Sequence, residues 1–349
     1  MSKVIKPSGE TGMTETHDSD GKVWRFALLG CGRMGRLHAS RLLADERAQV
    51  TTLYDVEQSA AEGLRQDLIP DAAVSARLEE LLRRDDVDAV VICTPTSLHF
   101  EHVTACRDRG WAVLCEKPLA DTAEATQKLI ESVQSEGPPL SVAYQRRSSA
   151  LYCSLRREVL SGKWGPVRAV SSHTSERWQQ TIAGTWREDP AINPGGFLGD
   201  AGSHKVDALF FTTGLDVAEV FAESDKCGSR VEILTSLTAT STDGVPITMD
   251  FVGNANHLAE DLHVHCEDAD LMIRDMRPWI ARNNIVEPLS PLEPQSHPVE
   301  SFLNLLDGSS PNIAPAQCAW PVFAFTQAAL ESAAKGQAVP VRTFDVLSP

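Results

Sequence analysis

Residues 26–38 constrain the fold of this chain more than any other stretch. They read Phe-Ala-Leu-Leu-Gly-Cys-Gly-Arg-Met-Gly-Arg-Leu-His, an apolar strand that turns on glycines into a helix. Gly30, Gly32 and Gly35 have the G-x-G-x-x-G spacing of a dinucleotide-binding turn. Gly30 allows the tight turn, Gly32 lets the backbone approach a pyrophosphate, and Gly35 lets the helix pack closely on the strand. The free amides at the helix start would attract phosphate oxygens.

Asp55 strengthens this interpretation. It lies twenty residues after Gly35, at the end of the next apolar run, 50–54. An acid at that position accepts hydrogen bonds from the ribose hydroxyls of adenosine, and its charge would repel a 2′-phosphate. The residues that follow are Val56 and Glu57, with no Lys or Arg to hold such a phosphate. The sequence therefore favours NAD(H) over NADP(H). The alternative, an Asp that merely ends a strand, is common.

The order of elements predicts an α/β chain with two folded domains. Strands and helices alternate from Trp24 to about Tyr144, which is typical of a doubly wound parallel sheet of the Rossmann type. Five later segments have strand character without intervening helices, which predicts an α+β domain with a mostly antiparallel open sheet. These segments lie near 217–224, 231–241, 245–252, 261–267 and 270–274. We expect a disordered tail over 1–22, a nucleotide-binding domain over 23–145 and a substrate and oligomerisation domain over 146–349.

Some local predictions are finer. Residues 77–84 should form a short helix, and helices are expected over about 298–306 and 317–334. Residues 281–298 contain many prolines and are predicted to form a loop.

Two further segments follow strands of the first domain. The apolar run 89–93 ends at Thr94-Pro95-Thr96-Ser97-Leu98-His99, and the run 112–115 ends at Glu116-Lys117-Pro118. Ligands of open parallel sheets lie beyond the carboxyl ends of the strands. The predicted cofactor-binding residues are Gly30, Gly32, Arg33, Met34, Gly35, Asp55, Thr94, Pro95, His99, Glu116 and Lys117.

Composition limits the partners of the chain. The formal net charge of −16 argues against nucleic acid, because phosphate contacts need a Lys- and Arg-rich surface. No run approaches the roughly 18 apolar residues that span a bilayer. The eight cysteines are scattered without a C-x-x-C pair, which favours reduced thiols and a cytoplasmic location.

Three motifs together resemble those of the glucose–fructose oxidoreductase/inositol dehydrogenase (Gfo/Idh/MocA) family. They are the glycine turn, Glu116-Lys117-Pro118, and Gly195-Gly196 followed by Asp200-x-Gly202-x-His204. The resemblance covers nearly everything after Lys22. It implies an NAD(P)-dependent oxidoreductase that acts on a sugar, polyol or related compound. It also implies that the open sheet of the second domain mediates a homo-oligomer, a dimer or tetramer.

The same resemblance matches Lys117, Asp200 and His204 to the family's catalytic set. Oxidising a secondary alcohol needs a hydride acceptor, a base and a group that stabilises negative charge on oxygen. An imidazole titrates near neutral pH, which suits His204 to the role of base. If a helix already includes Asp200, its side chain shares a face with His204. Which of the three residues moves the proton is left open by the sequence, and an isolated histidine here would read as an ordinary surface residue.

Four residues are weaker candidates for substrate contact: Arg146, Trp178, Trp186 and Arg187. A tryptophan packs in a core more often than it stacks on a sugar. The segment His263-Val264-His265-Cys266 invites a metal interpretation. In a strand, however, the two histidines would face one side and Cys266 the other, which spoils a three-ligand site. We therefore predict no metal.

Two alternatives to a dehydrogenase stay open at this point. Some members of the family use tightly held NAD to cleave glycosides by oxidation, elimination, water addition and reduction, and net NADH formation would distinguish the two classes. A nucleotide-binding sensor without turnover is the other alternative. The presence of Lys117, Asp200 and His204 disfavours it, because a sensor has no use for a base.

Overall fold

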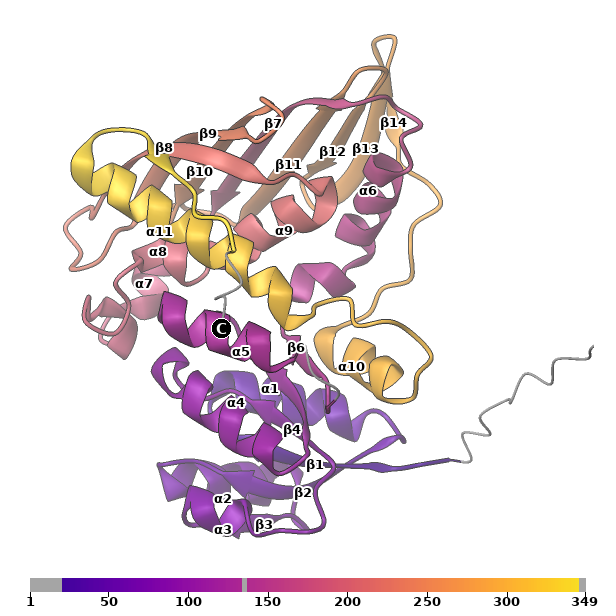
Figure 1. Ribbon diagram of the computed structural model, residues 1–349, viewed down its shortest axis with the longest axis vertical. Coiled ribbons are helices and arrows are strands. Elements are labelled where there is room, and N and C mark those ends of the chain that lie inside the picture. The colour runs from indigo at the N-terminus through magenta and orange to yellow at the C-terminus, as the bar shows by residue number, and fades with distance from the viewer. Residues whose placement is uncertain (1–20, 134–136, 345–349) are drawn as a thin grey trace, which may run out of the picture.

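The computed structural model describes residues 21–133 and 137–344. Two sheets dominate it, with helices between and around them (Figure 1). Most of the tail predicted over 1–22, namely residues 1–20, lies outside the described residues. No helix in the described ranges is both long enough and apolar enough to cross a membrane.

The first sheet has six parallel strands in the order β3-β2-β1-β4-β5-β6. The chain order reverses between β1 and β4, so their carboxyl ends border the crevice in which ligands of such sheets bind. The strands are β1 Trp24–Leu29, β2 Ala48–Tyr54, β3 Ala73–Ser75, β4 Ala89–Ile92, β5 Ala112–Cys115 and β6 Leu140–Val142. Its helices are α1 Arg33–Leu43, α2 Gln58–Leu68, α3 Leu78–Leu81, α4 His99–Asp108 and α5 Ala123–Ser132. The predicted Rossmann-type sheet is confirmed.

The second sheet has nine strands in the order β14-β13-β12-β11-β7-β10-β9-β8-β15, with only β7 and β10 parallel. This confirms the mostly antiparallel sheet. Its strands are β7 Val167–Ser175, β8 Val217–Asp225, β9 Leu234–Ser241, β10 Pro246–Val252, β11 Ala259–Cys266, β12 Asp270–Arg274, β13 Arg277–Arg282, β14 Ile285–Pro288 and β15 Val339–Pro340.

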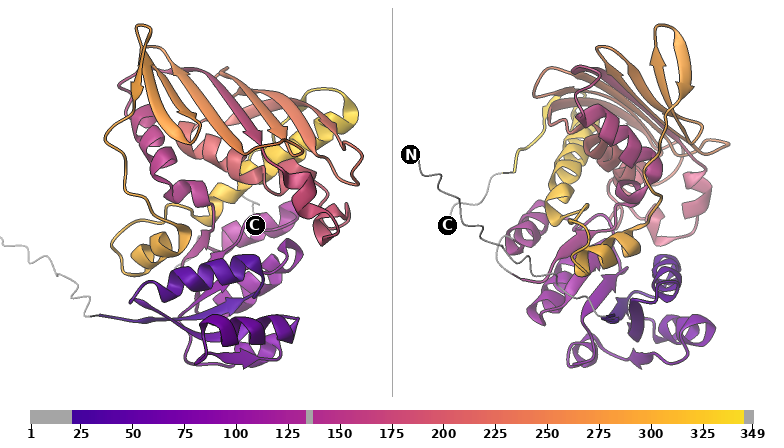
Figure 2. Two further views of the ribbon diagram at one scale, coloured as in Figure 1. Left: turned by 180° about the vertical axis from the view of Figure 1, so that it is seen from behind. Right: turned by 90° about the vertical axis from the view of Figure 1, so that its right-hand side faces the viewer.

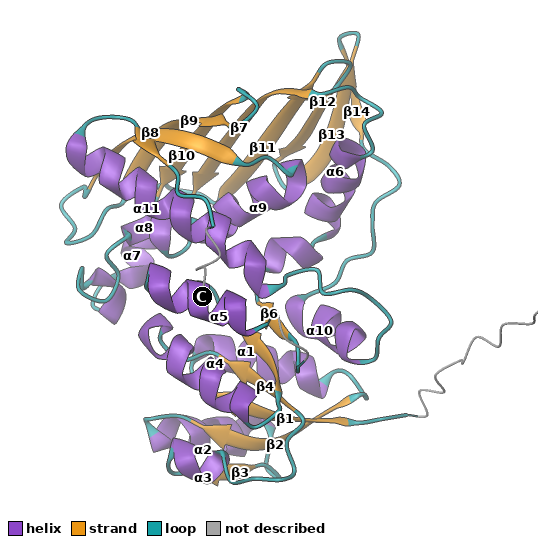
Figure 3. Ribbon diagram, viewed as in Figure 1, coloured by secondary structure: helices purple, strands orange, loops and turns teal. Residues whose placement is uncertain are grey.

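Helices cover one face of this second sheet. The long helices are α6 Ala150–Leu160, α9 Ser203–Thr213 and α11 Ala319–Lys335. They lie between the second sheet and the first (Figures 2 and 3). Along β10, buried and exposed residues alternate, which is the pattern of a sheet with one covered face. The second sheet and its helices therefore lie over the first sheet.

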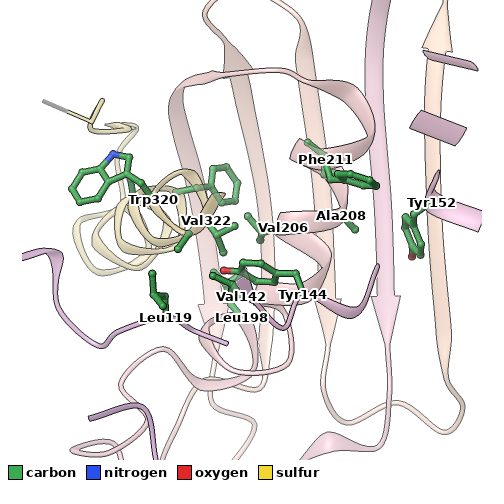
Figure 4. Close-up of a cluster of buried hydrophobic side chains, with 14 of the residues drawn as sticks. Leu119, Val142, Tyr144, Tyr152, Leu198, Val206, Ala208, Phe211, Trp320 and Val322 are labelled. Carbon is green, nitrogen blue, oxygen red and sulfur yellow. The ribbon is translucent and has the colours of Figure 1, made fainter. Parts of the chain in front are cut away.

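The two sheets share packing. One apolar cluster includes Val113 of β5, Tyr144 and Val264 of β11, and several of its members are drawn in Figure 4. Helix α10 (Pro298–Leu306) returns to the first sheet, where Phe302 packs edge-on against Phe26 with ring centroids 6.4 Å apart. These contacts hold the two sheets together. The boundary between two domains after residue 145 stays a prediction.

Two local predictions are wrong. The helix predicted over 77–84 is only α3, Leu78–Leu81. The loop predicted over 281–298 contains the end of β13 and all of β14, which form a hairpin. The turn is Asn283-Asn284, and both residues have positive φ, 50° and 63°. Asparagine tolerates that conformation, and a two-residue turn of this kind matches the twist of a hairpin.

Candidate active site

The glycine turn joins β1 to α1. Gly30 has φ +90°, and a Cβ there would lie 2.6 Å from the carbonyl carbon and oxygen of Cys93. A Cβ on Gly35 would lie 2.0 Å from the carbonyl oxygen of Gly30. Gly32 differs, since a Cβ there would meet nothing within 4 Å. Packing therefore requires Gly30 and Gly35, whereas the space beside Gly32 is open for a ligand.

The start of α1 supplies amides for that ligand. The N–H of Arg36 bonds to the carbonyl of Gly32, so the preceding amides, including those of Arg33 and Met34, have no partner within the helix. Asp55, directly after β2, lies against the same turn. Its two carboxylate oxygens accept hydrogen bonds from the amides of Cys31, at 2.7 Å, and Glu57, at 2.9 Å. These residues fit a dinucleotide, with pyrophosphate at the helix start and ribose near Asp55.

The two segments that follow β4 and β5 are tied to each other. The ring nitrogens of His99 lie 2.8 Å from the carbonyl oxygen of Pro118 and 2.9 Å from that of Thr94. Burial lowers the pKa of His99, so the neutral ring donates to one of these two oxygens. Glu116 is buried, and its carboxylate lies 2.8 Å from Nε2 of His38 on α1. His99 and Glu116 thus shape the loops that carry the other candidates. Pro95 is exposed beside Thr94 at the same edge.

Lys117 meets Asp200 across the crevice. Lys117 Nζ donates to the backbone oxygen of Asp200 at 2.9 Å and to Oδ1 at 3.3 Å, and Arg187 Nε donates to Oδ2 at 2.8 Å. Burial would raise the pKa of Asp200, but the charges of Lys117 and Arg187 outweigh it, and the pKa is lowered. Asp200 is therefore an ionised carboxylate held between two cations.

His204 lies in the first turn of α9, next to this pair. Its Nδ1 is buried and has no hydrogen-bond partner within the described ranges. Burial, followed by the charges of Lys117 and Lys205, holds the pKa of His204 well below its ordinary value. A neutral imidazole with a free nitrogen beside a lysine ammonium is suited to accepting a proton.

Comparison with known proteins identifies the family of this chain. Residues 24–144 match the family model described as an oxidoreductase family with an NAD-binding Rossmann fold, and residues 152–272 match the Gfo/Idh/MocA C-terminal domain. The chain belongs to the Gfo/Idh/MocA oxidoreductase family. The resemblance inferred from the three motifs is thereby confirmed.

Inositol dehydrogenases are among the relatives of this Gfo/Idh/MocA chain. An inositol 2-dehydrogenase of Agrobacterium fabrum is 33% identical over 151 residues, which are 43% of this chain and 45% of that protein. A scyllo-inositol 2-dehydrogenase (NADP(+)) of Bacillus subtilis is 28% identical over 195 residues, 56% of this chain and 53% of that protein. The alignments thus span about half the length of these relatives.

Solved structures share the whole fold. The WlbA dehydrogenase of Bordetella pertussis, solved with NADH and UDP-GlcNAcA, has a TM-score of 0.81 at 20% identity. The match covers 93% of this chain and 99% of that one. At 20% identity, this similarity shows only that the two proteins share a fold.

The geometry differs from one expectation about the candidate catalytic residues of this Gfo/Idh/MocA chain. Helix α9 begins only at Ser203, and Asp200 lies in the turn after the short helix α8, Gly196–Gly199. Asp200 and His204 are therefore not one helical turn apart on a shared helix face. The carboxylate of Asp200 pairs with Lys117 and Arg187, and has no hydrogen bond to His204 within the described residues.

A buried network behind His204 was missed in the sequence. Glu260 of β11 contacts Lys205 Nζ and accepts hydrogen bonds from Arg146, at 2.9 and 2.5 Å, and from the hydroxyl of Tyr152, at 3.3 Å. Burial lowers the pKa of Lys205 to about 8. Arg146, a substrate candidate, is thus bound to Glu260. Only the position of Lys205 next to His204 hints at this network in the sequence.

Glu176 is a further charged group that sequence reasoning missed. It directly follows β7, and burial raises the pKa of its carboxyl, while the charge of Lys205 opposes that rise. Nothing in the local sequence indicates that it faces the site.

The loop that carries the other substrate candidates divides between core and crevice. Trp178 is 5% exposed and packs on Phe197 with ring centroids 5.3 Å apart, so it belongs to the core, which counts against substrate contact. Trp186 is 44% exposed, and the Arg187 guanidinium carbon lies 4.4 Å from the centre of its ring. Arg187 itself bonds to Asp200. Of the loop residues, Trp186 and Arg187 remain candidates for substrate contact.

The depressed pKa of His204 predicts the pH dependence of activity. If neutral His204 is the base, kcat/KM should stay high below pH 6.5, about the pKa of an unperturbed histidine. Lys205→Met removes one of the charges that lower this pKa, so the acid limb of the profile should move to higher pH. Profiles of kcat/KM against pH for the wild type and this variant measure the shift. Lys226→Met, which removes an exposed charge, is the control. An unmoved acid limb in Lys205→Met would show that another group titrates there.

Proposed function

We propose that this chain is an NAD-dependent dehydrogenase that transfers a hydride between nicotinamide and a hydroxyl-bearing carbon of a sugar, a polyol such as an inositol, or a derivative of one. One observation carries the proposal. Lys117, Asp200 and the neutral His204 meet at the edge of the sheet where the glycine turn and Asp55 would hold a dinucleotide. The inositol dehydrogenases among its relatives agree with that substrate class.

Each residue has a distinct task in this proposal. The glycine turn and Asp55 would hold the dinucleotide, which would supply the hydride acceptor of the oxidation and the hydride donor of the reverse reaction. The neutral imidazole of His204 takes the hydroxyl proton of the substrate. The Lys117 ammonium donates a hydrogen bond to the same oxygen and stabilises its developing negative charge. Asp200 holds Lys117 in place through the contacts at 2.9 and 3.3 Å.

A substrate screen tests the proposal. Sugars, inositols and sugar acids are incubated with the full chain and NAD, and NADH is followed by absorbance. NADH formation from at least one compound is expected. Glycoside cleavage without net NADH would instead indicate the cofactor-recycling glycosidase reaction, and tight NAD binding without any turnover would indicate a sensor.

The preference for NAD(H) is a separate prediction. Asp55 lies against the glycine turn, where it would face the adenosine ribose, and a 2′-phosphate would meet its negative charge. We expect calorimetric titration to give at least about tenfold tighter binding of NADH than of NADPH, since a like-charge contact costs more than about 1.4 kcal/mol. Asp55→Ala should reduce the difference between the affinities for NADH and NADPH. Equal or tighter NADPH binding by the wild type would contradict the assignment.

The assembly state and location extend the proposal. The face of the second sheet opposite α6, α9 and α11 carries no helix within the described ranges (Figure 1). We propose that two copies pair through it, as the family resemblance implies, and light scattering on the purified chain measures the mass.

All eight cysteines are free of disulfides in the structure, in keeping with a proposed cytoplasmic location.

A further inference from the structure

A cavity adjoins the proposed catalytic residues. It has a volume of about 110 Å³ and lies between α5, the segment after Lys117, the loop before α8, and α11. Its wall is mainly apolar, with Leu119, Ile192, Val322, Phe323 and Leu330 among the lining side chains. Among the described residues its lining includes no Lys or Arg, and the carboxylates of Asp121 and Asp200 would repel a phosphate or carboxylate group. Its occupant should be uncharged and largely apolar.

Two buried side chains of the lining, Tyr144 and Thr326, have a hydroxyl without a hydrogen-bond partner within the described residues. Tyr144 is 1% exposed, and its hydroxyl has no hydrogen-bond partner among the described residues. In Figure 4 the hydroxyl points toward the side where Leu119 and Val322 lie, and all three residues line the cavity. The Tyr144 hydroxyl is not fully enclosed by protein atoms, so it borders the open space of the cavity. It would donate a hydrogen bond to an acceptor brought in by a ligand.

The cavity is continuous with the catalytic residues. Asp200 and Ser203 line it, and Asp200 is the residue that holds Lys117. The ring of Tyr144 packs edge-on against that of His204, with centroids 6.5 Å apart. Exposed Trp186 stands at the rim. A ligand in the cavity would therefore lie directly beside the reacting part of a substrate.

We infer that this cavity is a subsite for a short, uncharged acyl group carried by the sugar or polyol. The acyl carbonyl accepts the hydrogen bond of the Tyr144 hydroxyl, and the alkyl chain packs on Leu119, Val322 and Leu330. This inference rests on the proposed function for its substrate class, whereas the cavity itself can be tested without turnover.

A series of linear primary amides, from acetamide to hexanamide, provides the probe. Each is uncharged and pairs a carbonyl acceptor with a longer alkyl chain. Ligand-observed NMR on the full chain with NADH should show affinity rising by up to about fourfold per added methylene until the cavity is full. Val322→Phe would fill the cavity and should flatten the series. Tyr144→Phe should weaken every amide by about fivefold to tenfold, and thermal unfolding shows whether each variant is folded.

Different results would overturn the acyl subsite and the proposed dehydrogenase activity. Wild-type affinity that does not change with chain length would overturn the subsite, even if polyols are oxidised. Affinity that rises equally in the wild type and in folded Val322→Phe would also overturn it, because the amides would then bind elsewhere. If the amides bind as expected and no sugar or polyol yields NADH, the dehydrogenase proposal fails and the cavity stands as a binding site. Competitive inhibition of polyol oxidation by hexanamide would support its position beside the reacting carbon.

Discussion

Lys117→Ala and His204→Ala should each lose most turnover while still binding NADH. Loss of a positioned acid–base group typically lowers the rate by about 10²–10⁴-fold. Both residues would act on one substrate oxygen, Lys117 from the segment after β5 and His204 from the first turn of α9. The fold-loss in rate of the double variant should therefore be far smaller than the product of the two single fold-losses. Steady-state kinetics on the substrate found by the screen measures these rates.

Asp200→Asn serves as the graded control for this set. The substitution keeps the side chain's shape but removes the charge that pairs with Lys117 and Arg187. Because Asp200 positions Lys117 in this account, the loss should be smaller than that of Lys117→Ala. Near-normal turnover in Lys117→Ala or His204→Ala would contradict this account and show that other residues carry out the reaction.

Gly32→Val should abolish tight cofactor binding and leave the fold intact. Gly32 has φ −72° and ψ −158°, an extended conformation that valine adopts, and a Cβ there meets nothing within 4 Å. The added methyl groups would occupy the space that the pyrophosphate needs. Losing two hydrogen bonds to charged oxygens, at about 1.5 kcal/mol each, corresponds to roughly 100-fold weaker binding. Calorimetry with NADH measures the affinity, and thermal unfolding measures the stability.

Gly35→Ala is the matched control, with the opposite expectation. Its Cβ would lie 2.0 Å from the Gly30 carbonyl oxygen, so α1 must move away from β1 and the unfolding temperature should fall. If Gly32→Val folds and binds NADH normally, the glycine turn has only a structural role.

The local patterns of this sequence predict the fold well because they are strong at short range. Helix α10 spans Pro298–Leu306 as expected, with proline in its first turn and the His297 side chain accepting a hydrogen bond from Glu300 N. The hairpin at Asn283-Asn284 was missed because three nearby prolines, 288, 291 and 294, outweighed its turn signal.

The candidate site was only partly predictable. Lys117 and Asp200 were singled out by motif, yet their contact joins segments 83 residues apart, a pairing that no local pattern encodes. The same holds for Glu260, which reaches Lys205 and Arg146 from β11. The spacing of Asp200 and His204 would put both on one helix face only if a helix included Asp200, whereas α9 begins at Ser203, after Gly202.

Isotope transfer tests the central claim most directly. The full chain is incubated with NAD and a panel of sugars and polyols that carry deuterium at their hydroxyl-bearing carbons. Mass spectrometry then determines whether the reduced nicotinamide contains deuterium. We predict deuterium in the cofactor with at least one compound, and transfer at least about 10²-fold slower with the Lys117→Ala, His204→Ala double variant. NAD that binds to the wild type but gains no deuterium from any compound in the panel would contradict the account.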